Sequence, residues 1–449
     1  MGQKIDRTYL FERMPVGQAV RRQIIPSIAS QMVILLYNLA DTYFVGLLND
    51  AAQTAAVSLA YSVTLLMTAL ANLFAVGGAG RIAQLLGRRD RDGAREVCAV
   101  SFWFALLASA AFCVLFTLLS SPILRLCGAT DETYALACGY SRWVISVGGT
   151  FSILNTVLAN LIRADGSAFA ASMGVSAGGI INMLLDPLFV LPRFLGMGAE
   201  GAGLATAISN AAGMLILLGI IAARRRVGVV ALRPGDLRAA RRHIGRILRI
   251  GLPSAVQFLL TLVAVGALTK FMSLYDTAAV AALGIVKKLD MLPLYFSIGV
   301  ANGLLPLLAY NYSAENHERR HRIFLYGCAV AVGFSVVCVA GYEVFAPALV
   351  RIFIGDAQTI AYGTKLLRIM VLAMPMMSVC YPMITQFQAM GRMRESLICS
   401  ILRKGSLDIP LLFVLNALFP LYGCAAVQPI VDCICMIVAI YFYKKLPTA

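Results

Sequence analysis

The chain has 449 residues, of which 60% are hydrophobic and 13% are charged, and its mean hydropathy is +0.81. Soluble globular proteins carry about 25% charged residues, so this composition excludes a soluble fold and predicts an integral membrane protein. The net charge of +16 lies in short segments between apolar runs. It therefore indicates membrane topology and contact with anionic lipids, and we expect no nucleic-acid partner.

Apolar runs long enough to cross a bilayer, roughly 20 residues each, recur along the whole chain. They predict an all-α integral membrane fold with twelve transmembrane helices. In chain order the predicted spans are 22–46, 53–77, 97–119, 135–159, 168–191, 201–222, 248–273, 278–304, 323–346, 360–386, 396–418 and 422–443. We expect no cleavable signal peptide before the first span, because residues 1–22 are polar.

The two halves of the chain repeat one pattern at an offset near 225 residues. Pro26-Ser27 opens the first span as Pro253-Ser254 opens the seventh, and Asp186-Pro187 aligns with Ile409-Pro410. Six spans are an even number, so both halves insert with the same orientation, as in transporters built from parallel repeats. The predicted domains are a six-helix N-lobe, an Arg-rich cytoplasmic linker and a six-helix C-lobe, at 1–222, 223–247 and 248–449.

Lysine and arginine are concentrated in every second loop. The positive-inside rule then places these loops, and both termini, in the cytoplasm. The predicted inner segments are 81–95, 163–167, 223–249, 312–322, 391–395 and the C-terminal tail. We expect the protein in the cytoplasmic membrane of a bacterium.

The chain lacks the sequence signals of an enzyme or a pump driven by ATP. Its eleven cysteines and three histidines show no strong metal-ligand spacing, and neither a phosphate-binding loop nor a hydrolase motif appears. We expect no catalytic residues and no resident cofactor. Two parallel lobes with intramembrane carboxylates predict a secondary transporter. A membrane-embedded enzyme and a channel are the alternatives, but the sequence shows neither a nucleophile–base pair nor a repeated filter-like loop.

Two carboxylates fall at the same predicted depth in the N-lobe. At a rise of 1.5 Å per residue, Asp41 and Asp186 each lie roughly 27 Å from the inner start of their spans. Asn182 is one turn from Asp186 on the same face, and Thr206 and Tyr140 lie near that level. Oxygen ligands suit a small hard cation, whereas paired carboxylates could instead share a proton. All five residues are predicted to form the coupling site for H⁺ or Na⁺, with Tyr140 outside the Na⁺ ligand set.

The chain resembles the MATE (multidrug and toxic compound extrusion) family over essentially its full length. The resemblance rests on five stretches, in order Leu36–Gly46, Leu161–Gly166, Ile181–Phe189, Gly198–Thr206 and Leu305–Ala314. It implies efflux of amphipathic, often cationic drugs or toxic metabolites, coupled to a cation, through a V-shaped pair of lobes. We expect a monomer. A lipid-linked saccharide flippase of the same superfamily is the alternative, although the intramembrane acids favour a cationic substrate.

The resemblance is best to the DinF-like branch of the family. Other branches place coupling acids in the seventh and tenth spans. Here the seventh span offers only Gln257 and Lys270, and the tenth has no acid between Ile369 and Gln388. This departure favours a coupling site in the N-lobe.

Substrate contacts are predicted in both lobes, at Asn155, Asn182, Tyr37, Met377 and Gln257. Asn155 matches a family position but lies deeper than the ion site. Met377 belongs to a methionine-rich span whose flexible side chains suit varied apolar ligands. Pro26 is the predicted hinge of the first helix, because proline removes a backbone hydrogen bond.

The C-lobe has intramembrane charges of both signs. Asp290 follows Lys287 and Lys288, Asp408 follows Lys404, and Asp432 lies in the last span. We interpret them as mutually neutralising, with substrate binding as the alternative.

Overall fold

The computed structural model describes residues 8–48, 50–127, 129–225 and 228–446. Within these ranges all regular secondary structure is helical. Helices suit apolar segments in a bilayer, because every backbone hydrogen bond is made within the segment and no polar group faces lipid. The predicted all-α membrane fold is confirmed.

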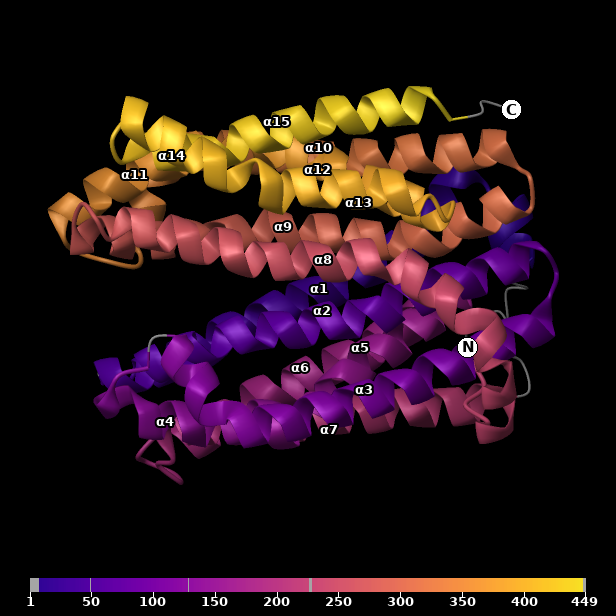
Figure 1. Ribbon diagram of the computed structural model, residues 1–449, viewed down its shortest axis with the longest axis horizontal. Coiled ribbons are helices and arrows are strands. Elements are labelled where there is room, and N and C mark those ends of the chain that lie inside the picture. Colours follow the sequence, from indigo (N-terminus) through magenta and orange to yellow (C-terminus); the bar gives the residue numbers. More distant parts are fainter. Residues whose placement is uncertain (1–7, 49, 128, 226–227, 447–449) are drawn as a thin grey trace.

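The helices form two bundles that lie side by side in Figure 1. The π-helical turn η1 (Tyr9–Arg13) precedes the first bundle and contacts α9 of the second. The first bundle contains α1 (Val16–Gly46), α2 (Ala51–Gly87), α3 (Arg91–Leu126), α4 (Asp131–Ser141), the π-helical turn η2 (Arg142–Val147), α5 (Gly149–Ala164), α6 (Ala168–Val190) and α7 (Gly198–Arg224). The second follows the short helix η3 (Pro234–Ala239) and contains α8 (Ala240–Met272), α9 (Thr277–Ser313), α10 (His317–Arg351), α11 (Ala357–Val371), α12 (Met374–Ala389), α13 (Met393–Ile401), η4 (Leu402–Ser406), α14 (Asp408–Leu418) and α15 (Tyr422–Lys444). We call these bundles the N-lobe and the C-lobe.

Nine of the described helices are individually long and apolar enough to cross a membrane. Two further spans are bent pairs. The helix that ends at Val147 meets α5 at 45°, and α11 meets α12 at 44°, which raises the number to eleven. The remaining predicted span, 396–418, is divided among α13, η4 and α14.

The internal repeat is confirmed by where the helices begin. α5 and α12 begin at Gly149 and Met374, and α6 and α13 begin at Ala168 and Met393, so each pair is 225 residues apart. The two bent pairs therefore occupy equivalent places in the two lobes.

Two predicted inner loops are shorter than expected. α2 continues to Gly87 and α5 continues to Ala164, so Arg81 and Arg163 belong to helices rather than to loops. Both arginines are buried, at 5% and 3% exposed. The boundaries were wrong because a charged residue near the end of an apolar run was taken as the start of a loop.

The lobes meet where α1 packs on α9 and α2 packs on α8, a contact that we call the lobe seam. Its glycines allow the backbones to approach closely. A Cβ on Gly251 would lie 1.9 Å from the carbonyl oxygen of Leu73, and one on Gly77 would lie 2.3 Å from that of Ile247. Small residues are what such close packing of membrane helices requires.

Both ends of the described chain lie at one end of the molecule, at the right in Figure 1. Arg319 at the start of α10 donates to the carbonyl oxygens of Phe11 (2.8 Å) and Met14 (2.6 Å). Near the C-terminus, the hydroxyl of Tyr443 on α15 is 2.5 Å from Nδ1 of His321, which like Arg319 lies on α10. We call this end, which also carries the Arg-rich segment before α8, the basic end.

Candidate functional site

Asp41 lies near the C-terminal end of α1 and is only 9% exposed. The hydroxyl of Tyr140, on α4, donates a hydrogen bond to its Oδ2 at 3.3 Å. The other carboxylate oxygen, Oδ1, is buried and has no hydrogen-bond partner among the described residues. An unpaired buried carboxylate oxygen costs free energy unless a proton or a cation occupies it.

A second group of buried oxygens lies between α6 and α7. The side-chain amide of Asn182 donates to Oδ1 of Asp186 (3.2 Å) and to the hydroxyl of Thr206 (3.4 Å). Asp186 is fully buried and Asn182 is 1% exposed. Oδ2 of Asp186 and Oδ1 of Asn182 have no partner in the described part of the chain.

The two groups form one electrostatic unit. Asp41 lies within electrostatic range of Asp186, and Tyr140 lies within range of both carboxylates. No lysine or arginine of the described ranges makes an ion pair with either carboxylate. We call Asp41, Tyr140, Asn182, Asp186 and Thr206 the N-lobe cluster. Its three unpaired oxygens fit a small cation or a proton.

Glycines let the helices that carry the N-lobe cluster approach one another. A Cβ on Gly178 of α6 would lie 3.1 Å from the carbonyl oxygen of Ser209 on α7. A Cβ on Gly179 would lie 3.1 Å from the ring of Tyr37 on α1. Asn182 and Asp186 follow these glycines by about one and two turns on the same helix. The close packing therefore carries their side chains toward α1 and α7.

The structure places one predicted substrate contact, Tyr37, beside the N-lobe cluster and a second, Asn155, about two helical turns from Thr206. Tyr37 packs against α6 and lies within electrostatic range of Asp41. Asn155 is 8% exposed, and its amide nitrogen is 3.0 Å from where a Cβ on Gly213 would lie. Gly213 is about two turns beyond Thr206 on α7, which agrees with the greater depth expected for Asn155.

Other predicted site residues lie outside the N-lobe cluster. Met377 on α12 and Gln257 on α8 are buried in the C-lobe, at 5% and 6% exposed. Pro26 lies inside α1, which continues as one helix from Val16 to Gly46. Its role as a hinge stays a prediction.

A polar contact that the sequence did not indicate lies closer to the basic end. The guanidinium of Arg163 donates to the hydroxyl of Ser30 at 3.1 Å, and the hydroxyl of Ser172 donates to the same oxygen at 3.3 Å. All three side chains are buried. The serines fall within apolar runs, where a small polar residue carries little signal, and Arg163 had been assigned to a loop.

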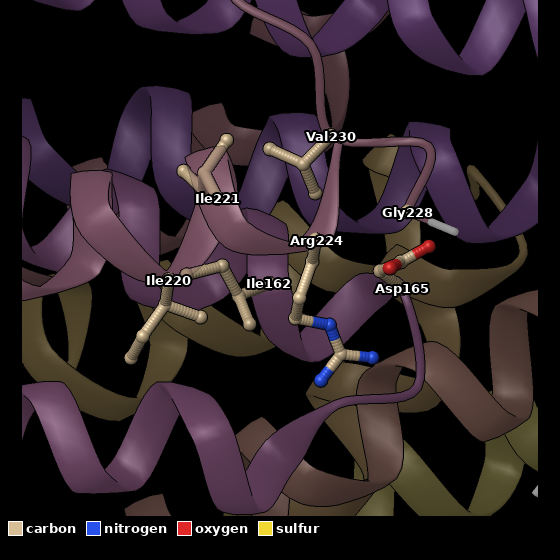
Figure 2. Close-up of a pocket in the computed structure, with 7 residues that line it drawn as sticks. All are labelled: Ile162, Asp165, Ile220, Ile221, Arg224, Gly228 and Val230. Atoms are coloured by element: carbon tan, nitrogen blue, oxygen red, sulfur yellow. The ribbon is translucent and has the colours of Figure 1, made fainter. Parts of the chain in front are cut away.

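Figure 2 shows a small cavity in the N-lobe, and none of the residues that line it belongs to the N-lobe cluster. It lies between the ends of α5 and α7 that point toward the basic end, whereas Thr206 is near the opposite end of α7. In this region Oδ1 of Asp165 accepts a hydrogen bond from the backbone of Val229 at 3.3 Å. The cavity is lined by Ile162, Asp165, Ile220, Ile221, Arg224, Gly228 and Val230.

One family model, MatE, matches the chain twice, at residues 26–188 and 253–414. This chain belongs to the MatE family. Each match lies within one lobe of the MATE protein, in agreement with the repeat. The chain is therefore a multi-pass membrane transporter and not an enzyme.

Known MATE proteins resemble the chain over nearly its full length. It is 29% identical to the multidrug export protein MepA of Staphylococcus aureus (strain NCTC 8325 / PS 47) over 437 residues, which are 97% of this chain and 95% of MepA. It is 25% identical to a multidrug resistance MATE family transporter of the MOP superfamily solved in an outward-facing conformation, with a TM-score of 0.90 and 98% of both chains covered. A MATE structure in a straight conformation gives a TM-score of 0.91 at 25% identity, with 98% of both chains covered.

Proposed function

We propose that this MATE protein exports amphipathic, often cationic small molecules in exchange for H⁺ or Na⁺, by alternating access. The observation that supports coupling is the set of unpaired buried oxygens on Asp41, Asn182 and Asp186. The flippase alternative is not favoured, because the relatives carry the names of multidrug exporters.

The N-lobe cluster offers a chemically reasonable site for either ion. Carboxylate, amide and hydroxyl oxygens are ligands that hard cations prefer, so Asp41, Asn182, Asp186 and Thr206 would hold Na⁺. A proton would instead be bound by one of the two carboxylates, which reduces their mutual repulsion. In both cases Tyr140 orients Asp41 through its hydrogen bond.

An ion drives transport only if it binds the two access states with different affinity. The ligands of the N-lobe cluster come from α1, α4, α6 and α7, so a movement of α1 would separate Asp41 from the rest. Pro26 would allow such a bend because α1 lacks a backbone hydrogen bond at that position. Ion binding and helix geometry would then be linked.

We further propose a DinF-like monomer in the bacterial cytoplasmic membrane, with both termini in the cytoplasm. The orientation is supported by the basic end, where the described termini and the Arg-rich segment before α8 lie together. The absence of acids from the seventh and tenth predicted spans supports the branch.

The test is dye efflux from vesicles under separately imposed proton and sodium gradients. We expect Asp41→Asn and Asp186→Asn each to reduce efflux per folded molecule to the level of empty vesicles. The double variant should be no worse than either single variant, because groups that act as a unit are not additive. Asp131→Asn is the control, since its side chain is 92% exposed.

Near-normal gradient-driven efflux by well-folded Asp41→Asn protein would contradict the coupling site. Loss of expression or thermal stability, together with normal efflux per surviving molecule, would identify both carboxylates as packing residues instead.

A further inference from the structure

A buried ion pair joins the turn η4 to α15 inside the C-lobe. Arg403, in the π-helical turn η4, donates to Oδ1 of Asp432 on α15 at 2.8 Å, and the two side chains are 1% and 0% exposed. The amide of Gln428 donates to the other oxygen of Asp432 at 2.8 Å. The guanidinium of Arg403 also lies 4.3 Å from the ring centre of Tyr381. Both carboxylate oxygens of Asp432 are therefore hydrogen-bonded within the lobe.

Four further charged side chains lie within electrostatic range of this ion pair or of its partner Gln428, and none of them forms an ion pair within the described ranges. Lys287 and Asp290 lie on α9, Lys404 lies in η4, and Asp408 begins α14. We call them the C-lobe quartet. Lys287 is within electrostatic range of the other three. Yet within the described ranges no nitrogen and oxygen of the quartet form an ion pair.

The hydrogen bonds of the C-lobe quartet are incomplete. The ammonium of Lys404 donates to the neutral side chain of Gln428 at 2.6 Å. Asp408 is 7% exposed, and its Oδ2 has no hydrogen-bond partner in the described part of the chain. Lys287, Asp290 and Lys404 are half-buried, so part of each remains accessible.

Charges inside a membrane protein normally pair directly, because an unpaired charge at this depth is costly. The C-lobe quartet holds two positive and two negative groups, with a net charge of zero, and Lys287 and Lys404 each lie within electrostatic range of Asp290 and Asp408. A simple cation would be repelled by the lysines, and a simple anion by the carboxylates. A ligand group that carries both charges complements all four and leaves the lobe neutral.

We propose that the C-lobe quartet binds the zwitterionic head of a transported amphiphile, with Lys287 and Lys404 on its carboxylate and Asp290 and Asp408 on its ammonium. This inference rests on the proposed export function and adds a substrate class to it. The π-helical turn at η4 supports it, since such turns inside helices are often found at functional sites. A fixed cation without a carboxylate would bind elsewhere, near the acids of the N-lobe.

The test compares three probes on the purified full-length protein. Norfloxacin carries a carboxylate and a piperazine ammonium, its ethyl ester lacks the carboxylate, and ethidium is a fixed cation. Lys404→Gln and Lys287→Gln should each raise the Kd for norfloxacin about tenfold or more, because each removes a hydrogen bond from a charged group. The Kd values for the ester and for ethidium should stay at those of the wild type.

Lys288→Gln is the matched control, because Lys288 is the neighbour of Lys287 on α9 but has no charged partner within range among the described residues. It should leave all three Kd values unchanged. If Lys288→Gln raised the Kd for norfloxacin as much as Lys404→Gln does, the inference would be overturned. It would also be overturned if Lys404→Gln or Lys287→Gln raised the Kd of all three probes equally.

The wild type supplies a measurement that does not depend on the folding of a variant. It should bind norfloxacin more tightly than the ethyl ester. Equal affinities, or no binding of norfloxacin, would overturn the inference. Ethidium efflux distinguishes failure of the zwitterion site from failure of the proposed export function. If the wild type exports ethidium under an ion gradient but binds norfloxacin and its ester equally, only the zwitterion site is contradicted. If the wild type exports neither ethidium nor norfloxacin, the proposed export function is contradicted.

Discussion

Replacing Gly251 with alanine should push α8 away from α2 at the lobe seam. The new Cβ would lie 1.9 Å from the carbonyl oxygen of Leu73, whereas real Cβ atoms essentially never come closer than 3.0 Å. The backbones must therefore separate by about 1.1 Å, the difference between these two distances. The obstacle is a backbone atom, so no side chain can rotate away to relieve it.

The free-energy cost follows from two opposing effects. Overpacking of this kind costs about 1–3 kcal/mol. Alanine is better than glycine in a helix by about 1 kcal/mol, which offsets part of that cost. The net penalty on the closed lobe seam is then up to about 2 kcal/mol, which would lower its population up to about thirtyfold.

The matched control is Gly266→Ala, on the same helix, where an added Cβ meets nothing within 4 Å. Spin labels at Arg88 and Arg242, both exposed, would report the distance between the basic-end segments of α2 and α8. Gly251→Ala should lengthen or broaden that distance and lower the Tm relative to Gly266→Ala. An unchanged distance together with an equal Tm would contradict the close backbone contact at the lobe seam.

Three further outcomes follow from orientation and charge. Cysteines introduced at Arg225 and Arg242 should react with an impermeant reagent only from the cytoplasmic side, and labelling of intact cells above the background of the parent chain would overturn the proposed topology. Asp290→Asn should change substrate range but keep the gradient dependence of ethidium efflux, and loss of coupling with normal drug binding would move the ion site to the C-lobe. Arg403→Met should destabilise the protein by about 3–5 kcal/mol, because it leaves Asp432 buried and unpaired, and Arg403→Met with Asp432→Leu should recover most of that loss in thermal unfolding.

The sequence predicted much of the N-lobe cluster because depth in a membrane follows from helix rise alone. Counting residues placed Asp41 and Asp186 at one level, and the i, i+4 spacing placed Asn182 on the face of Asp186. The structure adds the hydrogen bonds that join these residues to Tyr140 and Thr206. Their role in coupling stays a prediction.

Features that depend on how separate helices meet could not be predicted in the same way. The lobe seam is an example, because Gly77 and Gly251 read as ordinary apolar positions until α2 and α8 are placed together. The C-lobe network is another. Its aspartates and lysines stood out in the sequence, but Arg403, which pairs with Asp432, did not, because the contact between the π-helical turn η4 and α15 cannot be read from the sequence.

The matching bends of the two lobes bear on how this architecture arose. The bent pairs of the two repeats have nearly the same angle, 45° and 44°, but differ in the residues at the bend. In one copy a π-helical turn and Gly148 precede the bend, and in the other the second helix has Pro375 in its first turn. The position of Asp186 differs between the lobes, since it aligns with Ile409 and the nearest acid, Asp408, lies one residue earlier. The two lobes thus reach nearly the same shape with different residues. Under the proposed function this difference would let one lobe bind the ion and the other bind the ligand.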